Sequence, residues 1–334
     1  MTTMPTEGPE IGRLLRRIRS AGFPLPFLWR QLPDWWSAEA EAEPGAVTDL
    51  KILLSRRLGL DLASVLDEGP VALSLPGTVK FKRNVSLDEK PPDQYVAYCA
   101  AVANAVAAAV PRRSDALADA ASERAAILAD ESVRWVSLNA LLRRCWEDLG
   151  VAVVQVVEEP PAAKGFDAAS FRIDGLSVVV LAKRAAYSAW SAFWLAHELG
   201  HLAAGHVVDG GAIIDESDVT DPNDTEEAAA DGYGLELLGG ETAEVQVVGD
   251  VNSPSLAAAA LAMGRNLRID PGHLILRYAR ATNNWEVAQA ALARLEADAD
   301  VAATVNTVAA RFIDFSLLGE DVRTGLYSAL GLPG

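Results

Sequence analysis

Apolar residues recur at helical spacing through most of the chain. Over residues 48–66, leucines spaced in this way are interrupted by Gly59, which predicts two consecutive helices. The longest largely apolar stretch, residues 95–110, is half alanine and ends at Pro111. At 16 residues it is short for a membrane span, so we interpret it as a buried helix.

Shorter elements are predicted in the rest of the first half. Residues 11–36 begin as a basic amphipathic stretch and continue as a segment rich in proline and tryptophan. Residues 67–93 contain four prolines and are interpreted as a connector that includes a short basic strand at 79–83. Further helices are predicted over residues 94–110, 114–129 and 137–150.

After Gly150 the pattern becomes extended. Residues 151–157 are rich in β-branched valine and predict a strand. Residues 170–173 and 176–181 flank Asp174-Gly175, a strong signal for a hairpin turn. The chain therefore changes from helical to β structure at this point.

The last part of the chain returns to helical periodicity. A long helix is predicted over residues 185–205, followed by an irregular acidic loop and a helix over 226–238, with Thr225 as its N-cap. The remaining residues predict alanine- and leucine-rich helices with breaks at Gly264, Pro271-Gly272 and Gly319.

The net charge of −17 is unevenly distributed. Residues 1–124 carry 15 Lys and Arg against 16 Asp and Glu, whereas residues 125–334 carry 14 against 30. An acidic surface repels a phosphate backbone, so this balance argues against nucleic-acid binding by the C-terminal two-thirds. If any part of the chain contacts DNA, we expect it to be the N-terminal third.

Composition favours a cytoplasmic globular protein. Half of the residues are apolar and 22% are charged, and residues 1–10 contain no apolar run of the kind found in secretory signals. Cys99 and Cys145 lack the spacing of a metal or redox motif, so we interpret them as reduced core residues. No membrane association is expected.

The helix predicted over residues 185–205 contains the pattern His-Glu-x-x-His, from His197 through Glu198 to His201. Residues four apart share one face of a helix, so both imidazoles can reach one ion. Imidazole nitrogen suits Zn²⁺, and Glu198 can contact a water molecule at the metal. We predict His197 and His201 as zinc ligands and Glu198 as the general base. The alternative is a histidine pair that serves packing or capping only.

A catalytic zinc needs a third protein ligand and one open position. No histidine lies six residues after His201, and His206 is interpreted as a helix-end residue, where positive charge is favourable. We predict Glu227 as the third ligand, and Asp231, four residues later, as the group that holds a ligating histidine through its outer nitrogen. Glu226 is the rival ligand, because only spacing separates it from Glu227.

Together the two motifs resemble the ImmA/IrrE family of zinc metallopeptidases, in which Ala-His-Glu-x-x-His is followed by Glu-x-Glu-Ala-Asn-x-Phe-Ala-x-x-Leu-Leu. In this alignment Glu227 takes the ligand place, Asp231 the Asn place and Tyr233 the Phe place. The similarity covers about residues 133–240. Ala229 replaces the second Glu of the pattern, a departure that bears on the substrate and leaves the metal ligands unchanged.

The resemblance implies a bacterial zinc endopeptidase that cleaves a helix-turn-helix transcriptional repressor, often in a stress-response circuit. Glu198 would deprotonate the zinc-activated water and later deliver the proton to the leaving amine. Tyr187 and Tyr233 are candidate oxyanion partners. The strand at residues 176–181 is either an exposed edge that pairs with an extended substrate or an ordinary buried strand.

The resemblance also completes the predicted fold, which is α+β and mainly helical. It comprises a zincin-like metallopeptidase core with a small β-sheet over residues 131–240. Flanking this core are a helical region over residues 1–70, a connector with helices over 71–130, and a C-terminal helical region over 241–334.

Two alternatives remain open. Residues 53–66 resemble the last two helices of a phage-repressor helix-turn-helix domain, but a helical bundle that contacts only protein has the same pattern. DNA binding by the N-terminal region is therefore an open expectation. For the whole chain, the alternative to an endopeptidase is a non-proteolytic regulatory module that binds DNA or protein and retains a zinc-bound zincin fold. The acidic loop at residues 209–227 suits a basic partner, although such charge runs are commonly only solvated.

Overall fold

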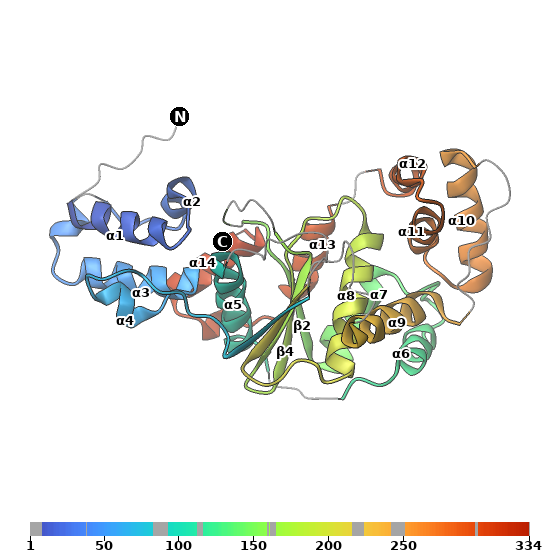
Figure 1. The fold of residues 1–334 in the computed structure, drawn as a ribbon, viewed down its shortest axis with the longest axis horizontal. Coiled ribbons are helices and arrows are strands. Elements are labelled where there is room, and N and C mark those ends of the chain that lie inside the picture. The colour runs from blue at the N-terminus through green and yellow to red at the C-terminus, as the bar shows by residue number, and fades with distance from the viewer. Residues whose placement is uncertain are drawn as a thin grey trace.

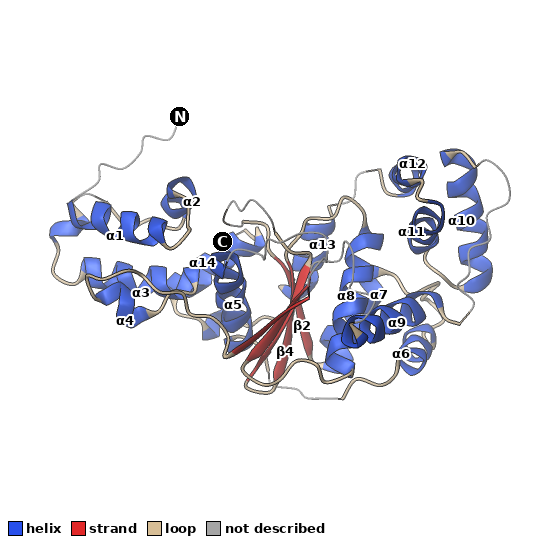
Figure 2. Cartoon of the chain, in the orientation of Figure 1, coloured by secondary structure: helices blue, strands red, loops and turns tan. Residues whose placement is uncertain are grey.

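The computed structural model describes residues 9–37, 39–82, 93–111, 116–158, 160, 165–215, 224–241, 251–297 and 300–333. In these residues the chain forms fourteen α-helices and one five-stranded mixed sheet. Helices surround the sheet and extend from it on both sides (Figure 2). The predicted α+β, mainly helical fold class is confirmed.

The sheet has the strand order β1-β5-β3-β4-β2. β1 is parallel to β5 and β2 is parallel to β4, whereas β3 is antiparallel to both β4 and β5. The strands are β1 (Thr78–Lys82), β2 (Val151–Gln155), β3 (Ala168–Ile173), β4 (Leu176–Leu181) and β5 (Gly211–Asp215). β3 and β4 form the predicted hairpin, in which Asp174 and Gly175 both have positive φ, as a type I′ turn requires.

The structure decides one open alternative for the sheet and overturns one prediction. The strand at residues 176–181, β4, is the ordinary buried strand and not the exposed edge, because it pairs with β3 on one side and with β2 on the other. The edges are β1 and β2, and helix α13 (Val301–Ala309) packs on β2 through Asn306, which donates to the Gln155 carbonyl and accepts from its amide. The prediction of an irregular loop after Gly205 is wrong, because residues 211–215 form strand β5, which contains the β-branched residues Ile213 and Ile214.

Side chains alternate across the sheet and contribute to two hydrophobic cores. On β4, Val178 and Val180 face one core, and Val179 and Leu181 face the other. Both faces are covered, so β4 is buried along its whole length. This accounts for the almost continuous apolar sequence of that strand.

The first core joins the N-terminal helices to one face of the sheet and to the last helix of the chain. α5 lies directly against the sheet, and α14 lies beside α3 and α5, although it is far from them in sequence (Figure 1). The elements on this side are α1 (Pro9–Ser20), α2 (Leu25–Arg30), η1 (Ala40–Ala42), α3 (Ala46–Leu58), α4 (Leu62–Leu66), α5 (Asp93–Ala108) and α14 (Glu320–Leu330).

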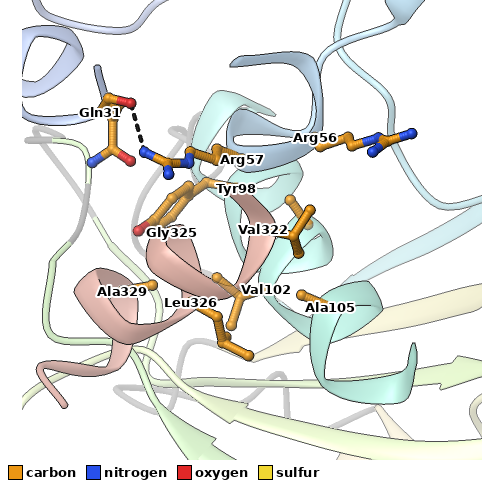
Figure 3. A pocket seen from close by; sticks show the side chains of 11 residues that line it. Gln31, Arg56, Arg57, Tyr98, Val102, Ala105, Val322, Gly325, Leu326 and Ala329 are labelled. Carbon is orange, nitrogen blue, oxygen red and sulfur yellow. Dashed lines mark hydrogen bonds between the residues drawn. The ribbon is translucent and has the colours of Figure 1, made fainter. Parts of the chain in front are cut away.

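Arg57 binds these distant segments together. Its guanidinium donates from Nε and Nη2 to the Asp321 carbonyl and from Nη1 to the Gln31 carbonyl. Figure 3 shows Arg57 directed toward Gln31, whereas the adjacent Arg56 points away. Hydrogen bonds from Arg57 of α3 to the segment after α2 and to α14 therefore hold together the residues that line the small pocket in this view.

Helices α3 and α4 form the predicted consecutive pair. Gly59 joins them at φ +66, and a β-carbon there would lie 2.1 Å from the Ala97 carbonyl oxygen of α5. α4 has only five residues, none of them basic, and it exposes Leu62 and Leu66. α4 therefore carries none of the basic side chains with which DNA-reading helices contact phosphates, and DNA binding by the N-terminal region stays a prediction.

The second core lies on the opposite face of the sheet and contains the helix with the His-Glu-x-x-His motif. The helices on this side are α6 (Ala120–Leu128), α7 (Leu138–Arg143), the π-helical turn η2 (Arg144–Leu149), α8 (Ser188–Ala203), α9 (Thr225–Gly239) and α13. The motif is therefore packed inside the molecule between the sheet and α9.

A third, smaller core is built by the helices at the far end of the molecule from the N-terminal helices (Figure 1). They are α10 (Ser253–Leu267), α11 (Pro271–Thr282) and α12 (Trp285–Leu295), and the short η3 (Phe315–Leu317) precedes α14. The break predicted at Gly264 is wrong, because α10 continues to Leu267. Gly264 instead allows the returning chain to approach, since a β-carbon there would lie 2.6 Å from the Ile269 carbonyl oxygen.

Cys99 and Cys145 are buried, reduced thiols, as predicted. In the described part of the chain, no helix combines the length and the hydropathy that crossing a bilayer requires. The division of the chain into four regions stays a prediction, and the first core brings together residues from both ends of the chain.

Candidate metal centre

Helix α8 directs its two motif histidines at one point. His197 and His201 lie one helical turn apart, and their Nε2 atoms are 3.1 Å from each other. Both side chains are buried, with 5% and 0% of their surface exposed. The structure therefore brings together the two imidazoles that the four-residue spacing places on one face.

Helix α9 brings Glu227 to the same point. Its Oε1 lies 3.1 Å from Nε2 of His201, and its Oε2 lies 3.5 Å from Nε2 of His197. The predicted N-cap, Thr225, is wrong: the cap is Asp224, whose side chain accepts from the amides of Glu226 and Glu227. This cap fixes the first turn of the helix, so that Glu227 faces the histidines.

Glu226, the rival ligand, turns away from the histidines. Its carboxylate lies 3.0 Å from Nζ of Lys80 and 2.8 Å from Nζ of Lys82, both on the edge strand β1. Hydrogen bonds from these two lysines lower the pKa of Glu226 to about 2. Of the two candidates, Glu227 is the one that lies with the histidine pair.

Each histidine has a second partner on its outer nitrogen. Asp231 Oδ1 lies 3.0 Å from Nδ1 of His197, the position predicted for it. His206 lies just beyond the end of α8, as predicted, but its Nδ1 is also 2.9 Å from Nδ1 of His201, a contact that the sequence interpretation did not include. Such outer partners fix the tautomer and the orientation of ligating imidazoles.

Strand β5 adds a fourth group that the sequence interpretation missed. Asp215 is the last residue of β5, is 4% exposed, and places Oδ2 2.5 Å from Nε2 of His197. One donor atom from each of His197, His201, Asp215 and Glu227 lies within 4.8 Å of the others. The signal that could have located Asp215 is the pair Ile213-Ile214 after two glycines, which is typical of a short strand.

The chemistry of this group fits a divalent cation. Both Glu227 oxygens are buried, and neither meets hydrogen-bond geometry with a donor in the described residues, although both lie within ion-pair distance of an imidazole. A buried carboxylate without donors is costly unless it is paired or coordinates a metal. Donor atoms of a tetrahedral zinc site lie about 3.3 Å apart, close to the 3.1 and 3.5 Å observed here. A buried metal site at this position is thus consistent with the geometry.

The electrostatics of the group agree with this interpretation. Burial disfavours the imidazolium of His197, but Asp215, Asp231 and Glu227 outweigh that effect and raise its pKa well above the ordinary value. Burial likewise favours the neutral carboxyl of Glu227, but the two histidines outweigh it and lower its pKa to about 2. The group attracts positive charge, as a cation site must.

Glu198 lies beside the group of four and is not one of its members. It is 1% exposed, and its Oε2 accepts a short hydrogen bond from the Ser170 hydroxyl on β3. Its Oε1 has no hydrogen-bond donor in the described part of the chain. Burial, with a further contribution from the Asp215 charge, raises the pKa of Glu198 to about 8.

The approach of α9 to α8 depends on small residues. A β-carbon at Gly200 would lie 2.8 Å from the Cα of Ala230, and one at Gly234 would lie 3.2 Å from the His197 amide nitrogen. Gly200 is the glycine inside the histidine motif. Without these close contacts, Glu227 and Asp231 could not reach the imidazoles.

The C-terminal helices hold the start of α8. Trp285, for which the sequence assigned no role, stacks on Trp190 with ring centroids 5.7 Å apart. Glu296 accepts from the Ser188 amide at the first residue of α8. The Asp270-Pro271-Gly272 turn begins α11, with Asp270 as its N-cap. These helices therefore pack against the start of α8, the helix that carries His197 and His201.

Neither tyrosine considered as an oxyanion partner lies at the centre. The Tyr233 hydroxyl donates to the Ala118 carbonyl, 3.1 Å away. Tyr187 is the N-cap of α8, ten residues before His197, which is about 15 Å along the helix and beyond the reach of its side chain. The oxyanion partner therefore stays unassigned.

Comparisons with known proteins identify no family for this chain. No protein-family model matches the chain, and no curated protein matches it.

We predict that Glu227 is needed for metal binding and that Glu226 is not. Glu227→Gln should weaken zinc affinity at least about tenfold, because a buried charged donor is replaced by a neutral amide. Glu226→Gln, one residue away, removes only contacts to Lys80 and Lys82. Zinc content after dialysis against a buffered chelator measures the difference. Retention of zinc by Glu227→Gln, with loss in Glu226→Gln, would reverse the assignment.

We also predict that Gly200→Ala displaces α9. The added methyl meets backbone atoms of Ala230, so overpacking should cost about 1–3 kcal/mol of stability and weaken zinc binding. Gly232→Ala is the matched control, since a β-carbon there meets nothing within 4 Å, and it should be neutral or stabilise by up to about 1 kcal/mol. Thermal unfolding with and without zinc measures both. Equal effects of the two substitutions would contradict the packing argument.

Proposed function

We propose that this protein is a zinc-dependent endopeptidase of the ImmA/IrrE type. The observation that supports this most strongly is the convergence of Nε2 of His197, Nε2 of His201 and the Glu227 carboxylate, with Glu198 beside them. Two imidazoles and a carboxylate from a later helix are a common ligand set of catalytic zinc. A site that served structure alone would have no need of an additional buried carboxylate.

Zinc is the metal we propose, because imidazole and carboxylate donors at these distances suit a tetrahedral ion. When bound, it would supply Lewis-acid activation of water and of the scissile carbonyl. His197 and His201 would bind it through Nε2, since Asp231 and His206 occupy their Nδ1 atoms. Glu227 would complete the three-ligand set.

Glu198 would carry the proton transfers. Its Oε2 is held by the Ser170 hydroxyl, which leaves Oε1 as the oxygen able to accept a proton. In peptide hydrolysis, Glu198 would take the proton from the attacking water and deliver it to the leaving amine. Ser170 would keep the carboxylate oriented between these two steps.

The substrate we propose is a helix-turn-helix transcriptional repressor or a similar regulatory protein. The acidic balance of residues 125–334 supports a basic partner, because opposite charge accelerates encounter. An extended substrate would not pair with β4, because both sides of that strand are already paired within the sheet.

A second candidate function is a regulatory module that retains the metal without proteolysis. It is favoured by one observation: His197, Glu198, His201 and Glu227 are all at most 5% exposed. A peptide must reach these groups to be cleaved, so the buried site would have to open before any hydrolysis. DNA binding by α4 finds no support in its side chains.

Glu198→Gln separates the two functions. The substitution keeps the size of the side chain, so zinc content and the unfolding temperature should stay close to wild type. Hydrolysis of a denatured repressor protein should fall by at least about 100-fold, because the proton acceptor is lost. Cleavage is measured by gel and mass spectrometry in zinc-replete buffer.

The matched control is Glu226→Gln, which should leave cleavage unchanged. Undiminished cleavage by Glu198→Gln would contradict the proposed mechanism. No cleavage by the wild type of any repressor, with zinc retained, would favour the regulatory module.

A further inference from the structure

A zinc site with three protein ligands leaves one coordination position to water, and Asp215 lies beside the three proposed ligands. Its Oδ2 lies 2.5 Å from Nε2 of His197. It also lies close enough to Glu198 to act on that carboxyl electrostatically. On the sheet, Asp215 is opposite Ala168 and therefore diagonal to Ser170, the residue that holds Glu198. Asp215 thus lies close both to His197 and to the proposed general base.

We propose that Asp215 is a fourth protein ligand of the metal and that it closes the coordination position needed by the hydrolytic water. The inference that this closure restrains hydrolysis rests on the proposed endopeptidase function. The assignment of Asp215 as a metal ligand does not depend on that function. In the conformation seen here, the centre therefore has two imidazole and two carboxylate ligands and is self-inhibited.

The distances allow all four groups to bind one ion. Three of the contacts among the donor atoms, at 3.1, 3.1 and 3.5 Å, already match tetrahedral zinc, for which about 3.3 Å is expected. The fourth, from Asp215 to His197, is shorter at 2.5 Å. It must widen by about 0.8 Å to reach the tetrahedral value, a shift that rotation of the Asp215 side chain can supply.

The backbone of Asp215 is held from both sides. Asp215 is in register with Ala168 on β3 and with Lys82 on β1, and its carbonyl accepts from the Asp167 amide at 2.9 Å. Lys82 in turn binds Asp224 at the start of α9. Because the strand cannot withdraw without breaking these bonds, release of the ligand requires the carboxylate to rotate away or a competing donor to replace it.

Cobalt spectroscopy tests the ligand assignment without any measurement of activity. The wild type loaded with Co²⁺ should show the visible absorption of a four-coordinate ion, and added azide should not change it. Asp215→Ala should bind azide with a clear change in this absorption, and its zinc affinity should fall at least about tenfold. Asp215→Asn, which keeps the side-chain size, should also show weakened zinc affinity if the charged ligand matters.

Asp167→Asn is the matched control. Asp167 is another buried carboxylate at the same end of the sheet and pairs with Lys183, so its replacement should leave the cobalt spectrum unchanged. The proposal is overturned if the wild type binds azide as readily as Asp215→Ala, or if both Asp215 variants keep wild-type zinc affinity.

A peptidase assay then separates this inference from the proposed function. Greater cleavage by Asp215→Ala than by wild type at saturating zinc supports a self-inhibited peptidase. If the cobalt spectra change as expected but no variant cleaves any protein, Asp215 stands as a ligand, and the self-inhibition is overturned together with the proposed function. If the spectra of wild type and Asp215→Ala are identical but the wild type cleaves, the peptidase stands and the fourth ligand is refuted.

Discussion

Three carboxylates and two imidazoles share a small buried volume, and the arrangement of the surrounding helices and strands depends on compensating their charge. Asp215, Glu198 and Glu227 are all at most 4% exposed. Charges buried in this way are tolerated only when they are paired or coordinate a metal. A divalent cation at the meeting point of the donor atoms would compensate the negative charge of the group.

The fold brings these groups together from three separate elements. α8 supplies His197, Glu198 and His201, α9 supplies Glu227, and β5 supplies Asp215. α9 can approach α8 because glycine occupies position 200 at their contact. The sheet positions β5 beside β3, and the C-terminal helices hold the start of α8 through Trp285 and Glu296. The candidate metal centre is thus a product of tertiary packing around one helix.

Local patterns predicted the parts of this arrangement that depend on neighbouring residues. The histidine spacing, the Asp174-Gly175 turn and the helix carrying Glu227 follow from short-range geometry, and the structure agrees with each. Asp215 was missed because its role arises only when β5 pairs with β3, 40 or more residues earlier in the chain. A different long-range pairing, of β2 with β4, covers the second side of β4, which the pattern alone could not distinguish from an edge strand.

The most direct measurement is anomalous X-ray diffraction at the zinc absorption edge, from crystals of the wild-type protein grown with zinc. We predict one strong peak about 2.1 Å from Nε2 of His197, Nε2 of His201 and an oxygen of Glu227. A map without a peak at this point, or with zinc held only by other residues, would contradict the metal centre on which the proposed function depends.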